Sequence, residues 1–150
     1  MADPWQTLPP MRYAGRDGPR LVFEAVHGPA RVVLTAVEED VVRVQVQPEG
    51  VARATRTWAV VGRAGDVGAE GRDREDLSVF ALPEPTIETV EGGLHVSTGR
   101  FVLTVALDPF ALRWSLPNGV PLFEDHTESA YEHVRGGGRA DRHPCPPLGA

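Results

Sequence analysis

The chain has 150 residues with 15 basic and 21 acidic side chains, and its formal net charge is −6. All of the basic residues are arginine, and the acidic balance argues against a nucleic-acid partner, since phosphate contacts require a basic surface. The single cysteine, Cys145, excludes an internal disulfide. The N-terminus lacks the features of a signal peptide, and no apolar run approaches the roughly 20 residues of a membrane helix. We therefore expect a cytoplasmic location and no membrane partner.

Residues 1–20 are rich in Pro, Gly and Arg, and they predict an irregular lead-in. Beyond them, short apolar or alternating runs lie between turn signals, a pattern typical of β-strands. Residues 62–76 carry too much glycine and charge to pack, so we expect a loop there. The expected strands before the last block are 21–27, 31–37, 41–47, 56–61, 77–81, 87–90 and 94–97.

The block from residue 96 to 124 predicts three further strands in a row. Apolar side chains repeat every second residue on both sides of a break at Asp108-Pro109. Pro117-Asn118-Gly119 then predicts a tight hairpin, because Asn-Gly favours the positive φ angles of a primed turn. The repeating residues are Phe101, Leu103, Val105 and Leu107 before the break, and Leu112, Trp114 and Leu116 after it.

Together these runs predict an all-β fold, an antiparallel β-sandwich of nine or ten strands over residues 21–134. The one helix candidate, residues 124–134, has no continuous apolar stripe. Residues 135–150 are too rich in Gly and Pro to form a strand, and they predict a flexible tail.

Carboxylates and imidazoles gather between residues 124 and 133. They make a weak metal site, because six residues separate His126 from His133, whereas paired histidine ligands of zinc are usually separated by three to five residues. A solvated acidic loop is the favoured interpretation, and we expect no metal and no cofactor. No Ser-His-Asp or Cys-His signature is present, and Trp58 and Trp114 fit core positions better than sugar-stacking platforms. The acids near the aromatic strands are Asp108, Glu124, Asp125 and Glu128, and we expect no catalytic role for them within this chain.

An ordered pattern extends over about residues 20–135: Val42-Arg-Val-Gln-Val46, then a series of hairpins, then Asn-Gly, Leu-Phe and an acidic group up to Asp125. This pattern resembles the N-terminal, galactose mutarotase-like β-sandwich of glycoside hydrolase family thirty-one, the α-glucosidases and α-xylosidases. The resemblance implies a partner, a (β/α)₈ barrel that carries both catalytic aspartates of a retaining mechanism. The parent enzyme would act on α-linked glucosides or xylosides, and this chain alone would have no activity.

The resemblance also implies a substrate-binding role for Asp125 and Thr127, which hold the positions of a loop that reaches the sugar pocket in some members. Glu124 is the alternative match for the loop acid. After Arg135 the family continues towards its barrel, whereas this chain continues into a Pro-rich end. A fragment, or a shifted reading frame near Gly138, would explain the change.

Two other readings stay open. The chain could be a stand-alone carbohydrate-binding sandwich, or an interaction module with no sugar function. An aldose mutarotase is disfavoured, because His27 and His95 form no catalytic constellation with a glutamate.

Overall fold

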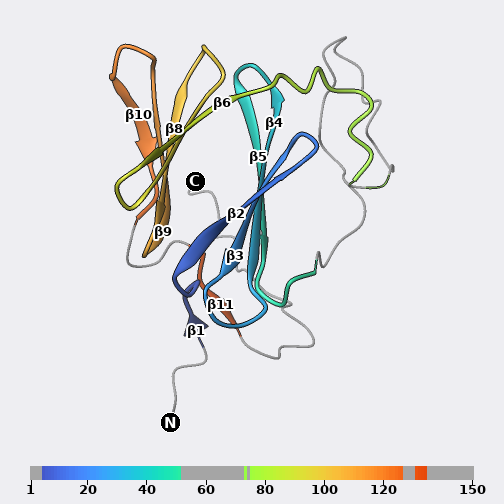
Figure 1. The fold of residues 1–150 in the computed structure, drawn as a ribbon, viewed down its shortest axis with the longest axis vertical. Helices are drawn as coiled ribbons and strands as arrows, with labels where there is room; N and C mark the ends of the chain where they lie inside the picture. The colour runs from blue at the N-terminus through green and yellow to red at the C-terminus, as the bar shows by residue number, and fades with distance from the viewer. Residues whose placement is uncertain (1–4, 52–72, 74, 127–130, 135–150) are drawn as a thin grey trace, which may run out of the picture.

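The structure is a computed structural model that describes residues 5–51, 73, 75–126 and 131–134. Within these residues there is no helix, and two antiparallel sheets pack face to face (Figure 1). One sheet has the strand order β2-β3-β4-β5 and the other has the order β10-β9-β8-β7-β6. The predicted all-β antiparallel sandwich is therefore confirmed, with nine strands in its two sheets.

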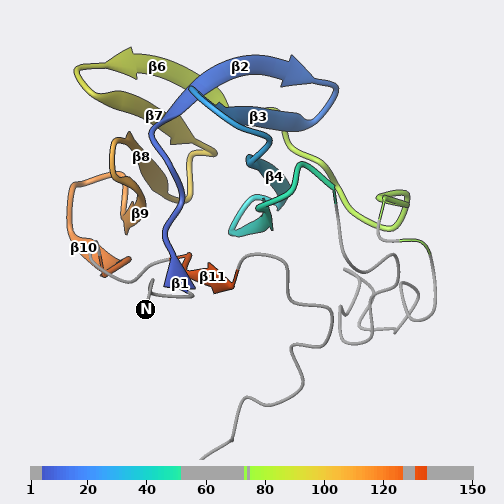
Figure 2. The ribbon, with the colours of Figure 1, turned by 90° about the horizontal axis from the view of Figure 1, so that it is seen from below.

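Within each of the two sheets the strands follow one another through short connections, and each strand pairs with a neighbour in the sequence. Figure 2 shows β2 and β6 on the same side of the sandwich, and the small β1–β11 pair on the other side. The first sheet consists of β2 (Met11–Asp17), β3 (Arg20–Ala25), β4 (Arg31–Glu38) and β5 (Val41–Gln47). The second consists of β6 (Thr86–Val90), β7 (Gly93–Ser97), β8 (Val102–Leu107), β9 (Phe110–Ser115) and β10 (Pro121–Glu124). The small pair is formed by β1 (Trp5–Gln6) and β11 (His133–Val134).

Alternate side chains of both sheets point inward and form one hydrophobic core. The predicted inward face of β8 is confirmed, because Phe101, Leu103 and Val105 are buried. Aromatic rings cross the core from β2 to the segment before β11, with consecutive ring centroids 5.4, 5.8 and 5.6 Å apart. The rings of this chain are, in order, Tyr13, Phe23, Phe110 and Tyr131.

The predicted irregular lead-in is wrong over Met11–Asp17, which forms β2 and pairs with β3. Met11 and Tyr13 alternate towards the core, so the strand period is present within the Pro- and Gly-rich segment. Gly15 has a φ of 126° and lies where the register shifts by one residue, so it forms a β-bulge. The glycine that suggested irregular chain is thus part of the strand.

Residues 77–81 form turns, so the strand predicted there is wrong. The carboxylate of Asp76 accepts a hydrogen bond from the backbone N–H of Ser78, and the N–H of Phe80 bonds to the carbonyl of Leu77. Such local hydrogen bonds use backbone N–H and C=O groups that a strand would otherwise offer to a neighbouring strand. Leu77 is buried even so, which explains its apolar character. The strand predicted over residues 56–61 and most of the loop predicted over 62–76 lie outside the described residues.

The hairpin predicted at Pro117-Asn118-Gly119 connects β9 and β10, but its turn is not a primed one. Gly119 alone among these residues has a positive φ, of 86°. The N–H of Gly119 bonds to the carbonyl of Leu116, and the N–H of Leu116 bonds to the carbonyl of Val120. This is a three-residue loop, with Pro117 pre-set for the first turn position and glycine at the left-handed position.

The outward face of the first sheet is covered as well as the inward face. Arg20, Thr35 and Arg43 lie in one row across β3, β4 and β5, and Glu75 lies over them. Its carboxylate is 2.8 Å from Arg20 and 3.6 Å from Arg43. Gln45, which the alternation of β5 places on its polar face, is buried and donates to Glu75. Alternation in β5 therefore separates polar from apolar residues, but it does not separate exposed from buried ones.

Candidate functional site

Asp125 follows the last residue of β10 and is half-buried against β9. Its backbone N–H bonds to the carbonyl of Leu112, and its Oδ2 accepts the N–H of Leu112 at 2.9 Å. The same Oδ2 accepts the hydroxyl of Tyr131 at 2.5 Å. The carboxylate thus continues the β9–β10 ladder past the end of the strand. Oδ1 has no hydrogen-bond partner among the described residues.

Tyr131 holds this arrangement from the other side. Its ring packs edge-on against Phe110, with centroids 5.6 Å apart, and its hydroxyl donates to Asp125. Burial raises the pKa of Tyr131 well above its usual value, and the hydrogen bond to Asp125 and the charge of that carboxylate raise it further. The hydroxyl therefore stays protonated and donates to the carboxylate of Asp125.

The other sequence candidates lie apart from Asp125. Glu124 is exposed, and its carboxylate is 3.5 Å from the guanidinium of Arg113 on β9. Asp108 is exposed in the turn between β8 and β9. Thr127 and Glu128 lie outside the described residues, and so does Trp58. Among the described residues, no group of three or more His, Cys, Asp and Glu side chains could hold a metal ion.

A groove of about 450 Å³ lies where the edge strands β5 and β10 face the same side of the sandwich. Its base includes Trp114 and Phe123, whose rings are stacked with centroids 4.4 Å apart and an interplanar angle of 21°. Phe123 is 58% exposed, so one face of this aromatic pair is open to solvent. The groove is lined by Asp40, Val41, Val42, Arg100, Phe101, Trp114, Leu116, Leu122 and Phe123.

Two turns form the polar rim of this groove, and they lie at the end of the molecule where the β4–β5 and β9–β10 turns gather (Figure 1). Asp40 comes from the β4–β5 turn and Arg100 from the loop between β7 and β8. The hydroxyl of Thr98 donates to the carbonyl of Glu39 and ties the two turns together across the sheets. Within the described chain, the side chains of Asp40 and Arg100 make no hydrogen bond or ion pair.

Sequence reasoning missed this groove, because its lining joins residues 40–42, at the start of β5, to residues between 100 and 123 of the other sheet. The expectation for Trp114, a core position, holds only in part. Its ring packs against the core cluster, but it also supports the exposed ring of Phe123.

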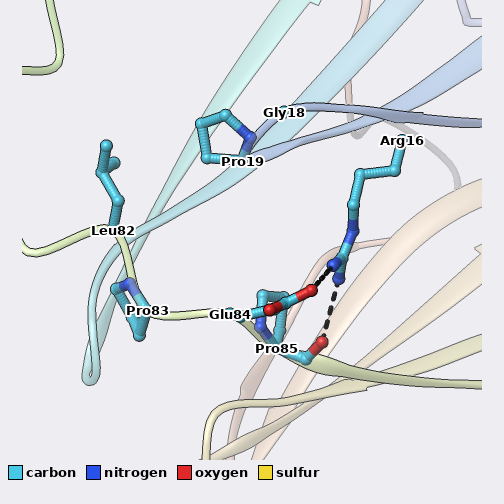
Figure 3. Close-up of a pocket in the computed structure, with 7 residues that line it drawn as sticks. All are labelled: Arg16, Gly18, Pro19, Leu82, Pro83, Glu84 and Pro85. Atoms are coloured by element: carbon cyan, nitrogen blue, oxygen red, sulfur yellow. Dashed lines mark hydrogen bonds and ion pairs between the residues drawn. The ribbon is translucent and has the colours of Figure 1, made fainter.

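A second, smaller pocket of about 370 Å³ lies on the β2–β6 side (Figure 3). The guanidinium of Arg16 forms an ion pair with Glu84 and donates to the carbonyl of Pro85 at 3.0 Å. Pro19, Pro83 and Pro85 make the rest of the wall rigid. These contacts join the β2–β3 hairpin to the segment before β6, so the pocket is explained by the joining of the two sheets.

Comparison with known proteins places the fold. No protein-family model matches the chain, and no curated protein matches it. Among solved structures, the chain is similar to a GH31 dextranase from Flavobacterium johnsoniae, determined in complex with glucose. The TM-score is 0.58 at 17% identity, over 81% of this chain and 13% of the dextranase chain. Within the described residues, no helix is long and apolar enough to cross a membrane. The chain therefore has the β-sandwich fold of a small part of a GH31 glycoside hydrolase, as the sequence resemblance implies.

Proposed function

We propose that the chain is the non-catalytic N-terminal domain of an α-glucosidase-like glycoside hydrolase. It packs on a catalytic (β/α)₈ barrel and lends the loop after β10 to the sugar pocket. The observation that carries the proposal is the fold likeness to a segment that makes up only 13% of a GH31 dextranase chain. A catalytic partner outside this chain follows naturally from that share. The parent enzyme is a retaining α-glycosidase that acts on α-linked glucosides or xylosides.

In this proposal Asp125 and Thr127 contact the sugar. The position of Asp125 supports its part, because Oδ2 is used by Leu112 and Tyr131, whereas Oδ1 has no partner among the described residues. A carboxylate oxygen is a suitable acceptor for a sugar hydroxyl. Glu124 is the less suitable acid, since its carboxylate lies beside Arg113.

The first test is the genomic DNA beside the coding sequence, read in all three frames. We expect it to encode a (β/α)₈ barrel with two catalytic aspartates, and the absence of any such barrel would contradict the proposal. The second test combines the separately expressed barrel with this chain and measures hydrolysis of an α-glucoside. We expect activity to depend on the chain.

The role of Asp125 is tested in that reconstituted enzyme with Asp125→Asn. The amide oxygen of asparagine can still accept from Leu112 and Tyr131, while the amide nitrogen replaces Oδ1 by a donor. We expect KM to rise about tenfold, the order of one hydrogen bond to a charged group. Glu124→Gln is the matched control and should leave KM unchanged. The opposite result would assign the loop acid to Glu124.

A further inference from the structure

The groove between β5 and β10 combines an open aromatic surface with two charged side chains that have no partner among the described residues. The ring of Trp114 stacks on the ring of Phe123, and this contact restrains the exposed ring. The volume, about 450 Å³, falls within the range of small-molecule sites, roughly 300–1,000 Å³. The site is also pre-formed, because the bond from Thr98 to Glu39 fixes its rim.

Apolar exposure is concentrated at this edge. Of the large apolar side chains that are exposed among the described residues, Val41, Leu122 and Phe123 line the groove, and Val120 lies in the turn that leads into β10. The remaining two, Val26 and Val51, do not line it. Such concentration marks a binding surface, whereas apolar side chains scattered singly need no explanation.

The charges of the rim select the chemistry of the ligand. Because Asp40 and Arg100 carry opposite charges, the rim gives a singly charged ligand no net attraction: an anion is attracted by Arg100 and repelled by Asp40, and the reverse holds for a cation. A purely apolar ligand would use neither group. A neutral ring that carries several hydroxyl groups can contact all three kinds of group in the groove. Its hydroxyls donate to the carboxylate of Asp40 and accept from the guanidinium of Arg100, and its C–H face covers the ring of Phe123.

We propose that this groove is a carbohydrate-binding site for a neutral pyranose sugar of one or two units, separate from the loop of Asp125. Phe123 is the platform, Asp40 the acceptor and Arg100 the donor. The proposed function enters only in the choice of glucose disaccharides as probes. The site requires no barrel, so it can be tested on this chain alone.

The experiment follows the amide resonances of the full chain by NMR during titration with maltose, isomaltose and the anionic sugar glucuronate. We expect saturable shifts at Asp40, Arg100 and Phe123 with a Kd of about millimolar order for the neutral disaccharides. Glucuronate should bind more weakly, because its carboxylate must lose water to approach a rim whose two charges cancel.

Substitutions at exposed positions separate the groove from other surfaces. Phe123→Ser and Asp40→Asn should each weaken binding by about tenfold or more, which is the order of one charge-assisted hydrogen bond or one stacked ring. Val26→Ser, which changes an apolar side chain that is 48% exposed and lies outside the groove, should leave the Kd unchanged. Each variant is first compared with the wild type by its thermal unfolding midpoint.

Three results would overturn the proposal. The first is the absence of saturable shifts up to roughly 100 mM sugar, which would detect any Kd of millimolar order. The second is binding that persists in both groove variants, because the sugar would then occupy another surface. The third is a dependence of the groove resonances on protein concentration without sugar, with a dimer seen by sedimentation, since a second copy of the chain would then be the occupant. None of these results bears on the proposed barrel partner.

Discussion

Replacing Tyr131 by phenylalanine removes one hydroxyl and tests the contact that fastens the end of β10. The structure places that hydroxyl 2.5 Å from Oδ2 of Asp125. Hydrogen bonds to charged groups contribute about 1.5–3 kcal/mol. Because Tyr131 is only half-buried, solvent screens this bond, and we expect the free energy of unfolding at pH 7 to fall by about 1.5 kcal/mol.

The same contact predicts how stability changes at alkaline pH. The folded-state pKa of Tyr131 lies above its unfolded value, chiefly because of burial and then because of Asp125. Below about pH 10 both states hold the proton, and the contribution is fully present. As the pH rises above that value the unfolded state loses its proton first, so the wild type loses up to about 1.4 kcal/mol of stability per pH unit. The loss continues until the folded pKa is passed.

The composition makes this measurement unusually clean, because the chain has no lysine and only two tyrosines. Urea unfolding of the wild type and of Tyr131→Phe is compared between pH 7 and the alkaline range, together with tyrosinate absorbance in the folded state. We expect the variant to lose less stability at alkaline pH than the wild type, because it lacks the tyrosine whose pKa is raised on folding. Tyr13 is present in both proteins, so it cannot account for a difference between them. Equal stability at pH 7 and equal alkaline slopes would refute the reasoning. So would ionisation of both tyrosines of the folded protein near pH 10.

Three further substitutions test the packing of the sandwich by urea unfolding. Gly93→Ala should cost about 1–3 kcal/mol as an overpacked site, because the new Cβ would lie 1.9 Å from the backbone oxygen of Val105, and a neutral outcome would show that β7 and β8 are further apart. Leu103→Ala should cost about 2–5 kcal/mol, since this side chain is fully buried in the core, and a loss below about 1 kcal/mol would contradict its position. Glu75→Gln should cost less than about 1 kcal/mol and lose its effect in high salt, because its ion pairs with Arg20 and Arg43 are half-exposed. A larger, salt-independent loss would instead indicate a desolvated ion pair.

Local patterns predicted most of the strands of the sandwich. Each of these strands pairs with the next one in the sequence, so the information for pairing lies within a short segment. For this reason the alternation of β8 and the break at Asp108-Pro109 were sufficient to predict the β8–β9 hairpin. The strand Met11–Asp17 was missed because Gly15 serves its bulge, and glycine in a sequence does not distinguish a bulge from an irregular segment.

The candidate site was less predictable, because its contacts join segments that are distant in the chain. The donors to Asp125 come from Leu112 and Tyr131, and neither position shows a local signal for that contact. The rim of the groove joins the β4–β5 turn to the loop after β7 through Thr98. Period and turn chemistry describe one element at a time, so they carry no information about which turns meet across two sheets.

The contacts of Asp125 also change what its presence in the sequence means. The N–H of Leu112 and the hydroxyl of Tyr131 both need an acceptor at this point, and the chain leaves the ladder at Asp125. A residue with no acceptor would leave two polar groups unpaired, at about 1–3 kcal/mol for each that stays buried. An acceptor after β10 is therefore required by the sandwich itself, whether or not a sugar is bound. Loss of sugar binding in Asp125→Ala would not separate the two roles, whereas Asp125→Asn keeps an amide oxygen as the acceptor for Leu112 and Tyr131, removes the negative charge, and puts a donor in place of the oxygen that a sugar could reach.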